Sequence, residues 1–396
     1  MAAKIRVLFA IGEMSGGGSQ RQLIGILRTL DRQRFVPHLY LVSPGGELLP
    51  EVPADVLVHL FAERYRQPLL SYPGQAHAAR IRDLTRVLRE CQIDLVYDRT
   101  YHMTMMAAPA ARRAGAARLS VVVADPQRDF ETNVERFRPV KRYLLRRAYC
   151  SADRVLAVSE GIRTATERYY GLPEGKAITL YNSYDLERVD RLMGEPLPPE
   201  EKKAADRFEI VAAGRLHPQK GFAFLLEAIR ELVHDRGRSH IHLRILGQGE
   251  LEPQLKAFVA KHTLSAHVTF AGFRKNPLPY FRQADLFCLS SLYEGMPNAL
   301  VEAMLCNVPV LATDCPSGPR EVLQGGRLGR LVPPADARAL TDAIDDAVRH
   351  PAEWQARVAE ARDSIRRTFA LEVGVRQLEE LMLSIVSQRR RSRENG

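Results

Sequence analysis

The sequence lacks any apolar run near the roughly 20 residues that a membrane-spanning helix needs. It is poor in cysteine, and none of its five cysteines has a CxxC or CxxH spacing, so neither a zinc site nor a disulfide framework is indicated. Residues 1–11 lack the small-residue cleavage site of a signal peptide. Aromatic content is only 7%, and no segment resembles a module that reads nucleic acid. These absences predict a cytoplasmic protein that binds no metal and no nucleic acid.

Positive charge is concentrated in the first half of the chain. Residues 1–185 hold 27 Lys and Arg against 19 Asp and Glu, and the remaining residues hold 30 against 28. Such an asymmetry favours an acidic partner, for example an anionic membrane surface or a phosphorylated lipid. A basic, solvated surface without a partner explains it equally well.

Two series of strand-like runs alternate with helical patterns. A chain of 396 residues exceeds the roughly 250–300 residues at which single cores stop growing. Short β-branched runs separated by longer helical patterns are typical of parallel α/β sheets. The predicted strands are 5–11, 38–42, 95–97, 119–123, 154–158 and 178–181, then 209–213, 242–246, 268–270, 286–289, 309–313 and 329–332. Helices are predicted over 20–30, 78–90, 221–234 and 251–262.

A proline-rich break at residues 194–200 separates the two series. We therefore predict two Rossmann-like domains, over 1–190 and 207–370, joined by a linker over 191–206. A C-terminal helix over 371–387 that can pack back on the first domain precedes a basic disordered tail over 388–396. Ligands of such sheets bind beyond the carboxyl ends of the strands, so the predicted site is a cleft between the domains.

The loop after the first strand of each domain suits an anion. Gly16, Gly17 and Gly18 precede a helix, where small residues let the backbone approach a ligand and the helix N-terminus favours negative charge. The pattern is not GxGxxG, and a simple tight turn is the alternative. Arg215 and Lys220 follow the first strand of the second series and could hold a diphosphate. Exposed surface cations are the alternative there.

Two carboxylates, Glu294 and Glu302, are separated by seven residues. A loop is predicted at Glu294 and a helix start just after it, which places Glu302 about 6 Å further along the axis. This spacing suits two acceptors that grip hydroxyls at opposite ends of an extended ligand. A capped helix with a solvated Glu302 is the alternative. The intervening backbone could hold a phosphate, and its residues are Gly295, Met296, Pro297, Asn298 and Ala299.

Several motifs in order resemble the family-four retaining glycosyltransferases with the GT-B fold. They are the glycine loop at 16–18, the segments 152–161 and 181–185, the loop 214–221, the glycines at 247–249 and 272, the pair Glu294 and Glu302, and the loop 315–321. The resemblance is nearly chain-long. The Cys-Pro-Ser-Gly-Pro sequence of the last loop is similar to a subgroup that builds bacterial surface glycans from UDP-activated hexoses or N-acetylhexosamines.

The resemblance implies a role for each of these positions. Arg215 and Lys220 would bind the donor diphosphate, with Gly16 and Gly17 approaching it from the first domain. Glu294 would bind hydroxyls of the donor sugar, and Glu302 those of the ribose. The backbone near Phe273 and Arg274 would meet the base.

The same resemblance implies the chemistry. The donor is a nucleotide-diphosphate sugar, no cofactor or metal is needed, and the leaving phosphate itself helps to deprotonate the acceptor hydroxyl. The acceptor is a glycan or a lipid-linked sugar.

One position departs from the family pattern. Many relatives carry a His after the strand that is predicted here at 119–123, close to the donor sugar. This chain has Asp125 and Arg128 in that stretch, and its nearest histidine is His102. Either Asp125 or Arg128 makes the contact, or this subgroup lacks it.

Two other functions remain open. A sugar-nucleotide epimerase shares the architecture, but it needs paired acid and base groups around the sugar, and none is evident. A non-catalytic scaffold subunit would be free to lose the cations and carboxylates that this chain retains.

Residues 136–147 mix six cations with apolar residues. The apolar residues include Phe137, Tyr143, Leu144 and Leu145. A helix after Pro139 could lie on an anionic membrane, which would place the protein peripherally at its inner face. That position suits an acceptor such as a polyprenyl-diphosphate-linked sugar or a lipopolysaccharide core. The alternative is an ordinary amphipathic helix with solvated arginines.

Overall fold

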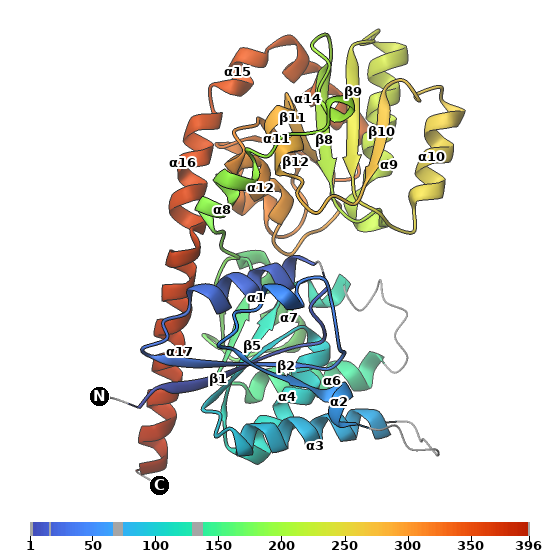
Figure 1. Ribbon diagram of the computed structural model, residues 1–396. Coiled ribbons are helices and arrows are strands. Elements are labelled where there is room, and N and C mark those ends of the chain that lie inside the picture. Colours follow the sequence, from blue (N-terminus) through green and yellow to red (C-terminus); the bar gives the residue numbers. More distant parts are fainter. Residues whose placement is uncertain (1–2, 16, 66–73, 129–137, 395–396) are drawn as a thin grey trace. The chain divides into compact units, whose positions relative to one another are not determined.

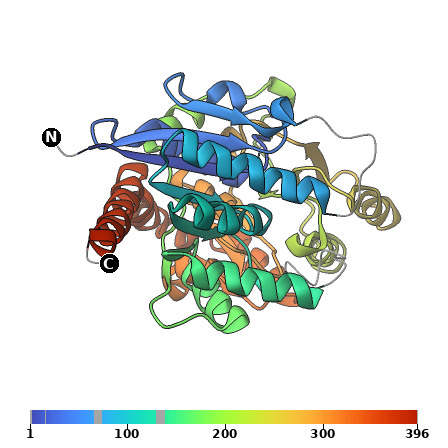
Figure 2. The same cartoon turned by 90° about the horizontal axis from the view of Figure 1, so that it is seen from below.

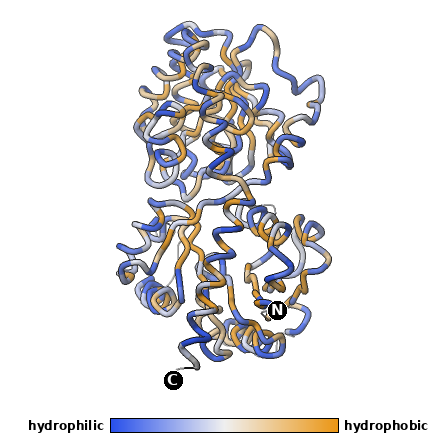
Figure 3. Tube along the Cα trace, turned by 90° about the vertical axis from the view of Figure 1, so that its left-hand side faces the viewer, coloured by the Kyte–Doolittle hydropathy of each residue, from blue (hydrophilic) through white to orange (hydrophobic). Residues whose placement is uncertain are grey.

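The computed structural model describes residues 3–15, 17–65, 74–128 and 138–394 (Figure 1). The chain divides into two compact units, Met1–Tyr184 with Leu371–Gly396 and Asp185–Ala370. Each unit contains one all-parallel sheet covered by helices, which confirms the predicted pair of α/β domains. In both units the hydrophobic segments concentrate in the interior (Figure 3).

The sheet of the first unit has seven strands in the order β3-β2-β1-β4-β5-β6-β7. Their bounds are β1 (Ile5–Ile11), β2 (Phe35–Leu41), β3 (Leu57–Leu60), β4 (Leu95–Arg99), β5 (Ala117–Val122), β6 (Arg154–Ala157) and β7 (Ala177–Thr179). All six predicted strands are present. The seventh, β3, gives no sequence signal because it is a four-residue edge strand, with Leu57 and Val58 exposed.

Helices cover both faces of this sheet. On one face α3 (Gln75–Glu90), α4 (Tyr101–Ala114) and α6 (Arg138–Ser151) lie side by side (Figure 2). Buried side chains of α3 and α4, such as Leu84 and Met103, form one core with Leu8 of β1. On the other face α1 (Gly18–Thr29) packs against α17 (Leu371–Glu394), which also contacts β5. The remaining described helices are α2 (Phe61–Arg64) and α7 (Glu160–Tyr170).

The second unit has a six-stranded sheet in the order β10-β9-β8-β11-β12-β13. Its strands are β8 (Phe208–Ala213), β9 (Ile241–Leu246), β10 (Val268–Gly272), β11 (Leu286–Leu289), β12 (Val310–Thr313) and β13 (Arg330–Val332), as predicted within a few residues. Its helices are α8 (Leu186–Leu192), α9 (Phe222–Arg230), α10 (Glu252–Lys261), α11 (Leu278–Gln283), α12 (Asn298–Leu305), α13 (Pro319–Val322), α14 (Ala337–Arg349), α15 (Pro351–Gln355) and α16 (Val358–Phe369). The helices α9, α10 and α14 share one apolar core with the sheet.

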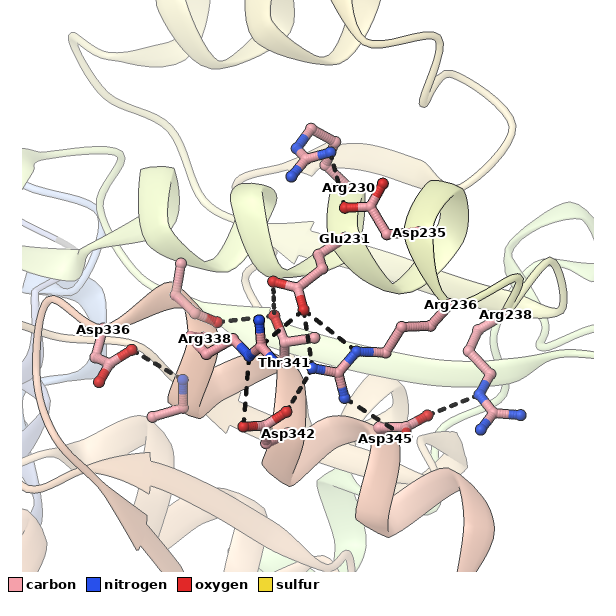
Figure 4. Close-up of polar contacts among 12 residues, drawn as sticks. Arg230, Glu231, Asp235, Arg236, Arg238, Asp336, Arg338, Thr341, Asp342 and Asp345 are labelled. Atoms are coloured by element: carbon pink, nitrogen blue, oxygen red, sulfur yellow. Dashed lines mark hydrogen bonds and ion pairs between the residues drawn. The ribbon is translucent and has the colours of Figure 1, made fainter.

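Ion pairs hold a helical extension of α9 against α14 (Figure 4). Arg236 binds Glu231 at 2.8 Å and Asp345 at 3.6 Å, and Arg238 binds Asp345 at 2.7 Å. Arg236 and Arg238 thus link the extension of α9 to α14 through Asp345.

The unit boundaries differ from the predicted domain limits. Residues 191–206, predicted as a linker, belong to the second unit, where Lys203 Nζ binds Asp285 at 2.5 Å. Residues 388–394, for which the sequence predicts a disordered tail, form the last turns of α17. They are ordered because Arg389 and Arg390 bind Asp153 and Asp94, each at 3.0 Å, in the first unit.

Within the described residues, no helix combines the length and the apolar character needed to cross a bilayer.

Candidate active site

The loop after β8 carries the two cations predicted to hold a diphosphate, in residues 214–221. Lys220 Nζ donates to Glu294 Oε1 at 2.6 Å, and their side chains are 20% and 5% exposed. Arg215 is 71% exposed, and its Nη2 lies 4.0 Å from Glu250 Oε2. The structure therefore joins Lys220 and Glu294 in a largely buried ion pair and leaves Arg215 at the surface.

Hydrogen bonds tie this loop to the loop after β11. Leu292 N donates to Gln219 O at 2.7 Å, and Ser290 Oγ donates to Lys220 O at 2.8 Å. Gly221 ends the loop with a φ of 62°, and a Cβ there would lie 2.1 Å from Ser290 O. Only glycine allows the two loops to approach this closely. Their contact places Lys220 next to Glu294 without a ligand.

Glu294 is held on one side only. Its Oε1 accepts from Ser291 Oγ at 2.6 Å as well as from Lys220. Ser291 is fixed in turn, because its carbonyl accepts from Thr313 Oγ1 at 2.5 Å. Within the described part of the chain, Glu294 Oε2 makes no hydrogen bond. That oxygen can accept from a ligand hydroxyl without losing an existing partner.

The loop after β12, residues 315–321, packs onto the loop that carries Glu294. Glu294 N donates to Pro316 O at 3.3 Å. At Gly318, with a φ of 93°, a Cβ would lie 2.5 Å from Pro297 Cδ, so a side chain cannot fit. Burial raises the pKa of the Cys315 thiol to about 12, so it stays protonated and is no nucleophile near neutral pH.

The helix α12 begins at Asn298, just after Gly295 and Pro297, as predicted. Two of the backbone positions predicted to bind a phosphate cannot donate to it. The N–H group of Asn298 already donates to Met296 O at 2.9 Å, and Pro297 has no N–H group. The N–H groups of Met296 and Ala299 donate to no acceptor among the described residues, so these two can donate to a phosphate. Glu302 lies in the second turn of α12 and is half-buried.

The residues predicted to meet the base lie after β10. The Phe273 ring is 47% exposed, as a stacking surface for a base would be. The Arg274 side chain binds Glu201 and lies over the Tyr280 ring at 5.6 Å. It lines a cavity of about 430 Å³ that includes none of the residues of the two loops around Lys220 and Glu294. The Arg274 guanidinium thus belongs to a separate polar cluster, which leaves only its backbone for the predicted role.

The strand order explains how these positions meet. Phe273, Lys220 and Glu294 follow β10, β8 and β11, and the 315–321 loop follows β12. These strands lie in the order β10-β9-β8-β11-β12 and all run parallel. Their carboxyl ends therefore form one edge of the second sheet, the edge where such sheets bind ligands.

In the first unit, Gly16 lies outside the described residues. Gly17 caps the N-terminus of α1 with a φ of −75°. Asp125 Oδ1 accepts from the backbone N–H groups of Gln127 and Arg128, at 2.9 and 3.2 Å. The Asp125 carboxylate therefore stabilises a local turn. His102, the other residue considered for this contact, lies on α4, where burial lowers the pKa of its imidazole.

Two residues that fix the ion pair were not singled out from the sequence. Ser291 donates to the Glu294 carboxylate, and Gln219 Nε2 donates to Tyr293 O at 2.9 Å. Both lie inside segments chosen for their charged residues. Ser291 lies three residues before its partner in the same loop, whereas the partner of Gln219 lies in a different loop, and neither residue carries a charge that would mark it in the sequence.

The family comparisons match both halves of the chain. Residues 16–188 match the model of Glycosyltransferase Family 4, and residues 207–350 match that of Glycosyl transferases group 1. An uncharacterised glycosyltransferase of Methanocaldococcus jannaschii is 32% identical over 176 residues, which cover 44% of this chain and 43% of that protein.

A second relative, from Campylobacter jejuni, is 32% identical over 193 residues, covering 49% of this chain and 50% of its own. It is named N-acetylgalactosamine-N,N'-diacetylbacillosaminyl-diphospho-undecaprenol 4-alpha-N-acetylgalactosaminyltransferase. The matched parts thus span about half the length of these two relatives.

Among solved structures, HepE of Anabaena in complex with UDP-glucose superimposes with a TM-score of 0.79 at 22% identity, covering 96% of this chain and 100% of HepE. At this identity the likeness concerns the fold. The two family matches identify a Glycosyltransferase Family 4 domain followed by a Glycosyl transferases group 1 domain, and the likeness to HepE shows that the chain has the GT-B fold.

Proposed function

We propose that the chain is a retaining glycosyltransferase. It would move a hexose or N-acetylhexosamine from a UDP-sugar to a hydroxyl of a glycan or lipid-linked acceptor. The observation that carries the proposal is the Lys220–Glu294 pair at the carboxyl edge of the second sheet. It sets a cation for the diphosphate beside an acceptor for sugar hydroxyls, on loops that are locked together before the donor binds.

Lys220 has three N–H donors, and Glu294 Oε1 takes one of them. The other two can bind oxygens of the donor diphosphate. As the bond from the sugar to the phosphate breaks, negative charge develops on the leaving phosphate, and Lys220 and Arg215 offset it. In this scheme no metal is needed for that purpose.

The acceptor oxygen attacks the anomeric carbon from the face that the phosphate leaves. The departing phosphate oxygen takes the acceptor proton, so the products are UDP and a glycoside of unchanged configuration. Glu294 Oε2 orients the sugar by accepting from a hydroxyl, and Glu302 grips the ribose. Support for the donor comes from HepE, which was crystallised with UDP-glucose.

A lipid-linked acceptor draws support from the name of the Campylobacter jejuni relative, which specifies a diphospho-undecaprenol sugar. It also draws support from α6. Val140, Tyr143 and Leu144 are 56%, 54% and 48% exposed, and with exposed Arg147 they form one stripe at positions i, i+3, i+4 and i+7.

Two arginines of the segment 136–147 bind carbonyl groups of a neighbouring helix. Arg142 Nη2 donates to Tyr169 O at 2.9 Å, and Arg146 Nε donates to Tyr170 O at 3.0 Å, at the C-terminal end of α7. The proposed membrane contact is therefore the apolar stripe with Arg147. Residues 136 and 137 of the predicted segment lie outside the described residues.

The membrane proposal predicts co-sedimentation with anionic vesicles. Binding should weaken at high salt, since the Debye length falls from about 10 Å at 0.1 M to about 3 Å at 1 M. Changing Tyr143 and Leu144 together to Ser should abolish binding, while Leu57→Ser, an equally exposed apolar residue on β3, should not. Equal binding by both variants would refute the contact through α6.

The enzymatic proposal is tested with UDP-sugars and a polyprenyl-diphosphate-linked sugar. UDP release that depends on the acceptor, with an unchanged anomeric configuration by NMR and full activity in chelator, is the expected result. Turnover of a UDP-sugar without acceptor would indicate an epimerase. Failure to bind any nucleotide sugar in a thermal-shift screen would indicate a scaffold subunit.

A further inference from the structure

Two histidines and a cysteine meet under the edge of the first sheet. His38 is the middle residue of β2, His59 lies on the edge strand β3, and Cys91 follows the last residue of α3. His38 Nδ1 lies 3.1 Å from His59 Nε2, and Cys91 Sγ lies 3.9 Å from the same nitrogen. All three atoms lie within 4.8 Å of one another. Three side chains of metal-ligating types, from separate elements, thus lie together.

Two of the three separations are close to those of a tetrahedral zinc site. Zinc binds histidine nitrogen at about 2.0–2.1 Å and cysteine sulfur at about 2.3 Å, which places neighbouring ligand atoms about 3.3 Å (N to N) and about 3.6 Å (N to S) apart. The observed 3.1 and 3.9 Å differ from these values by a few tenths of an ångström. A hydrogen bond between the two imidazoles would explain the first distance, but it gives no reason for the thiol beside the same nitrogen.

The surroundings permit a cation to enter. His38 is buried, whereas His59 and Cys91 are partly exposed, so the point is reachable from solvent. The two arginines nearby have their own partners: Arg64 binds Asp83 at 3.1 Å, and Arg6 donates to Gln92 at 2.7 Å. The thiolate would supply the negative charge that the ion needs.

We propose that His38 Nδ1, His59 Nε2 and Cys91 Sγ bind one divalent transition-metal ion of the zinc type, with a fourth position open to water. Two imidazoles and a thiolate are the ligands that such ions prefer over Mg²⁺ or Ca²⁺. Binding forms one metal–sulfur bond and releases the thiol proton to solvent. The ion would join β2, β3 and α3, and so fasten a short edge strand that has little buried apolar surface of its own.

The experiment uses the full chain, stripped with a chelator and then titrated with Co²⁺. We expect a thiolate-to-cobalt charge-transfer band, the visible bands of tetrahedral Co²⁺ and a stoichiometry of one ion per chain. Zn²⁺ should displace Co²⁺ and so remove these bands. Loss of a residue that only hydrogen-bonds a metal ligand already costs about 10–100-fold in metal affinity, so loss of a ligand itself, in Cys91→Ser or His59→Asn, should weaken binding at least about 100-fold. Matched controls are Cys150→Ser and His77→Asn, which lie outside the cluster and should bind as the parent does.

Circular dichroism identifies variants that fail to fold. Cys91→Ser is nearly isosteric, so it keeps the test decisive if the histidine variant is unstable. The absence of a charge-transfer band in the folded parent chain, or its persistence in Cys91→Ser, would overturn the proposal. Metal should also raise the Tm of the parent chain and not that of Cys91→Ser. The site is independent of the proposed transferase activity, which is expected to survive chelation, so either proposal can fail alone.

Discussion

In each unit the first strand along the chain is followed by a loop and a helix, but the two loops are built differently. In the first unit residues 12–17 contain no cation, and backbone bonds position residues 12 and 14, for example from Leu48 N to Met14 O at 3.0 Å. In the second unit the loop carries Lys220, bound to Glu294. The first loop can therefore offer a ligand backbone groups, whereas the second offers charge. One fold element thus serves two kinds of contact, and substitutions should separate them.

Replacing Lys220 by Met should have the largest effect on the affinity for UDP. It removes a charge-assisted contact with the diphosphate, which costs about 1.5–3 kcal/mol or roughly 10–100-fold in UDP affinity by calorimetry. It also leaves Glu294, only 5% exposed, without its cation, so the Tm should fall as well.

The matched control is Lys256→Met, which breaks an ion pair of similar length, 2.7 Å to Glu252, on the surface of α10. Exposed pairs contribute about 0–1 kcal/mol, so stability should hardly change and UDP affinity should not change. An unaltered UDP affinity in Lys220→Met would remove the diphosphate from this loop.

Glu294→Gln should affect turnover rather than the affinity for UDP. The amide keeps the size of the side chain but is a weaker acceptor for a sugar hydroxyl. We expect turnover to fall about 10²–10³-fold, in the range seen when one preorganised polar contact is lost. The affinity for free UDP should be retained, because Lys220 stays in place. Glu302→Gln should instead lower the affinity for free UDP about tenfold. Equal effects of both variants on UDP and on a UDP-sugar would contradict the assignment of the two carboxylates to opposite ends of the donor.

Most of the fold could be predicted from the sequence, because buried parallel strands are short continuous apolar runs that punctuate helical patterns. Both series were found this way. The signal fails for β3, whose exposed Leu57 and Val58 look like a loop. It also fails at the C-terminus, where the basic residues that suggest disorder are held by acidic partners more than 200 positions away, such as Asp153 for Arg389.

The candidate site was predictable to the extent that its groups follow strand ends. Sequence position alone indicated that Lys220 and Glu294 share an edge of the sheet. It could not indicate that they bind each other, nor that Asn298 N–H is already used. The cluster of His38, His59 and Cys91 was missed for the same reason. His38 and His59 are 21 residues apart in the sequence, and His59 and Cys91 are 32 residues apart. Only the pairing of β2 with β3 and the course of α3 bring them together.

Arg215→Ala should have a smaller effect than Lys220→Met. The side chain is 71% exposed, and its ion pair with Glu250 is long at 4.0 Å, so the Tm should stay within about 1 °C of the parent value, since exposed pairs contribute about 0–1 kcal/mol. Water screens this cation, and we expect UDP to bind about fivefold more weakly, or about 1 kcal/mol. The loss should diminish at high salt. A drop in affinity as large as that of Lys220→Met would mean that Arg215 moves onto the diphosphate when the donor binds.

Gly17→Ala should have the smallest effect, and it tests whether the glycine loop of the first unit meets a ligand at all. With a φ of −75°, Gly17 has a backbone that any residue adopts, and an added Cβ would meet only the flexible end of Gln20, 2.6 Å away. The free protein should therefore tolerate alanine, with an unchanged Tm. The same change at Gly221 would press a Cβ against Ser290 O and should destabilise the second unit strongly.

Because Gly17→Ala leaves the free protein intact, any loss of UDP affinity in this variant reports a ligand that approaches the backbone of the loop. We expect a loss of about threefold to tenfold, since a methyl group would push such a ligand outward and weaken one or two hydrogen bonds worth about 1 kcal/mol. Calorimetry with UDP and with UDP-glucose measures it. If both ligands bind Gly17→Ala as they bind the parent chain, the first loop only makes a turn, and the cations and carboxylates of the second unit hold the donor without it.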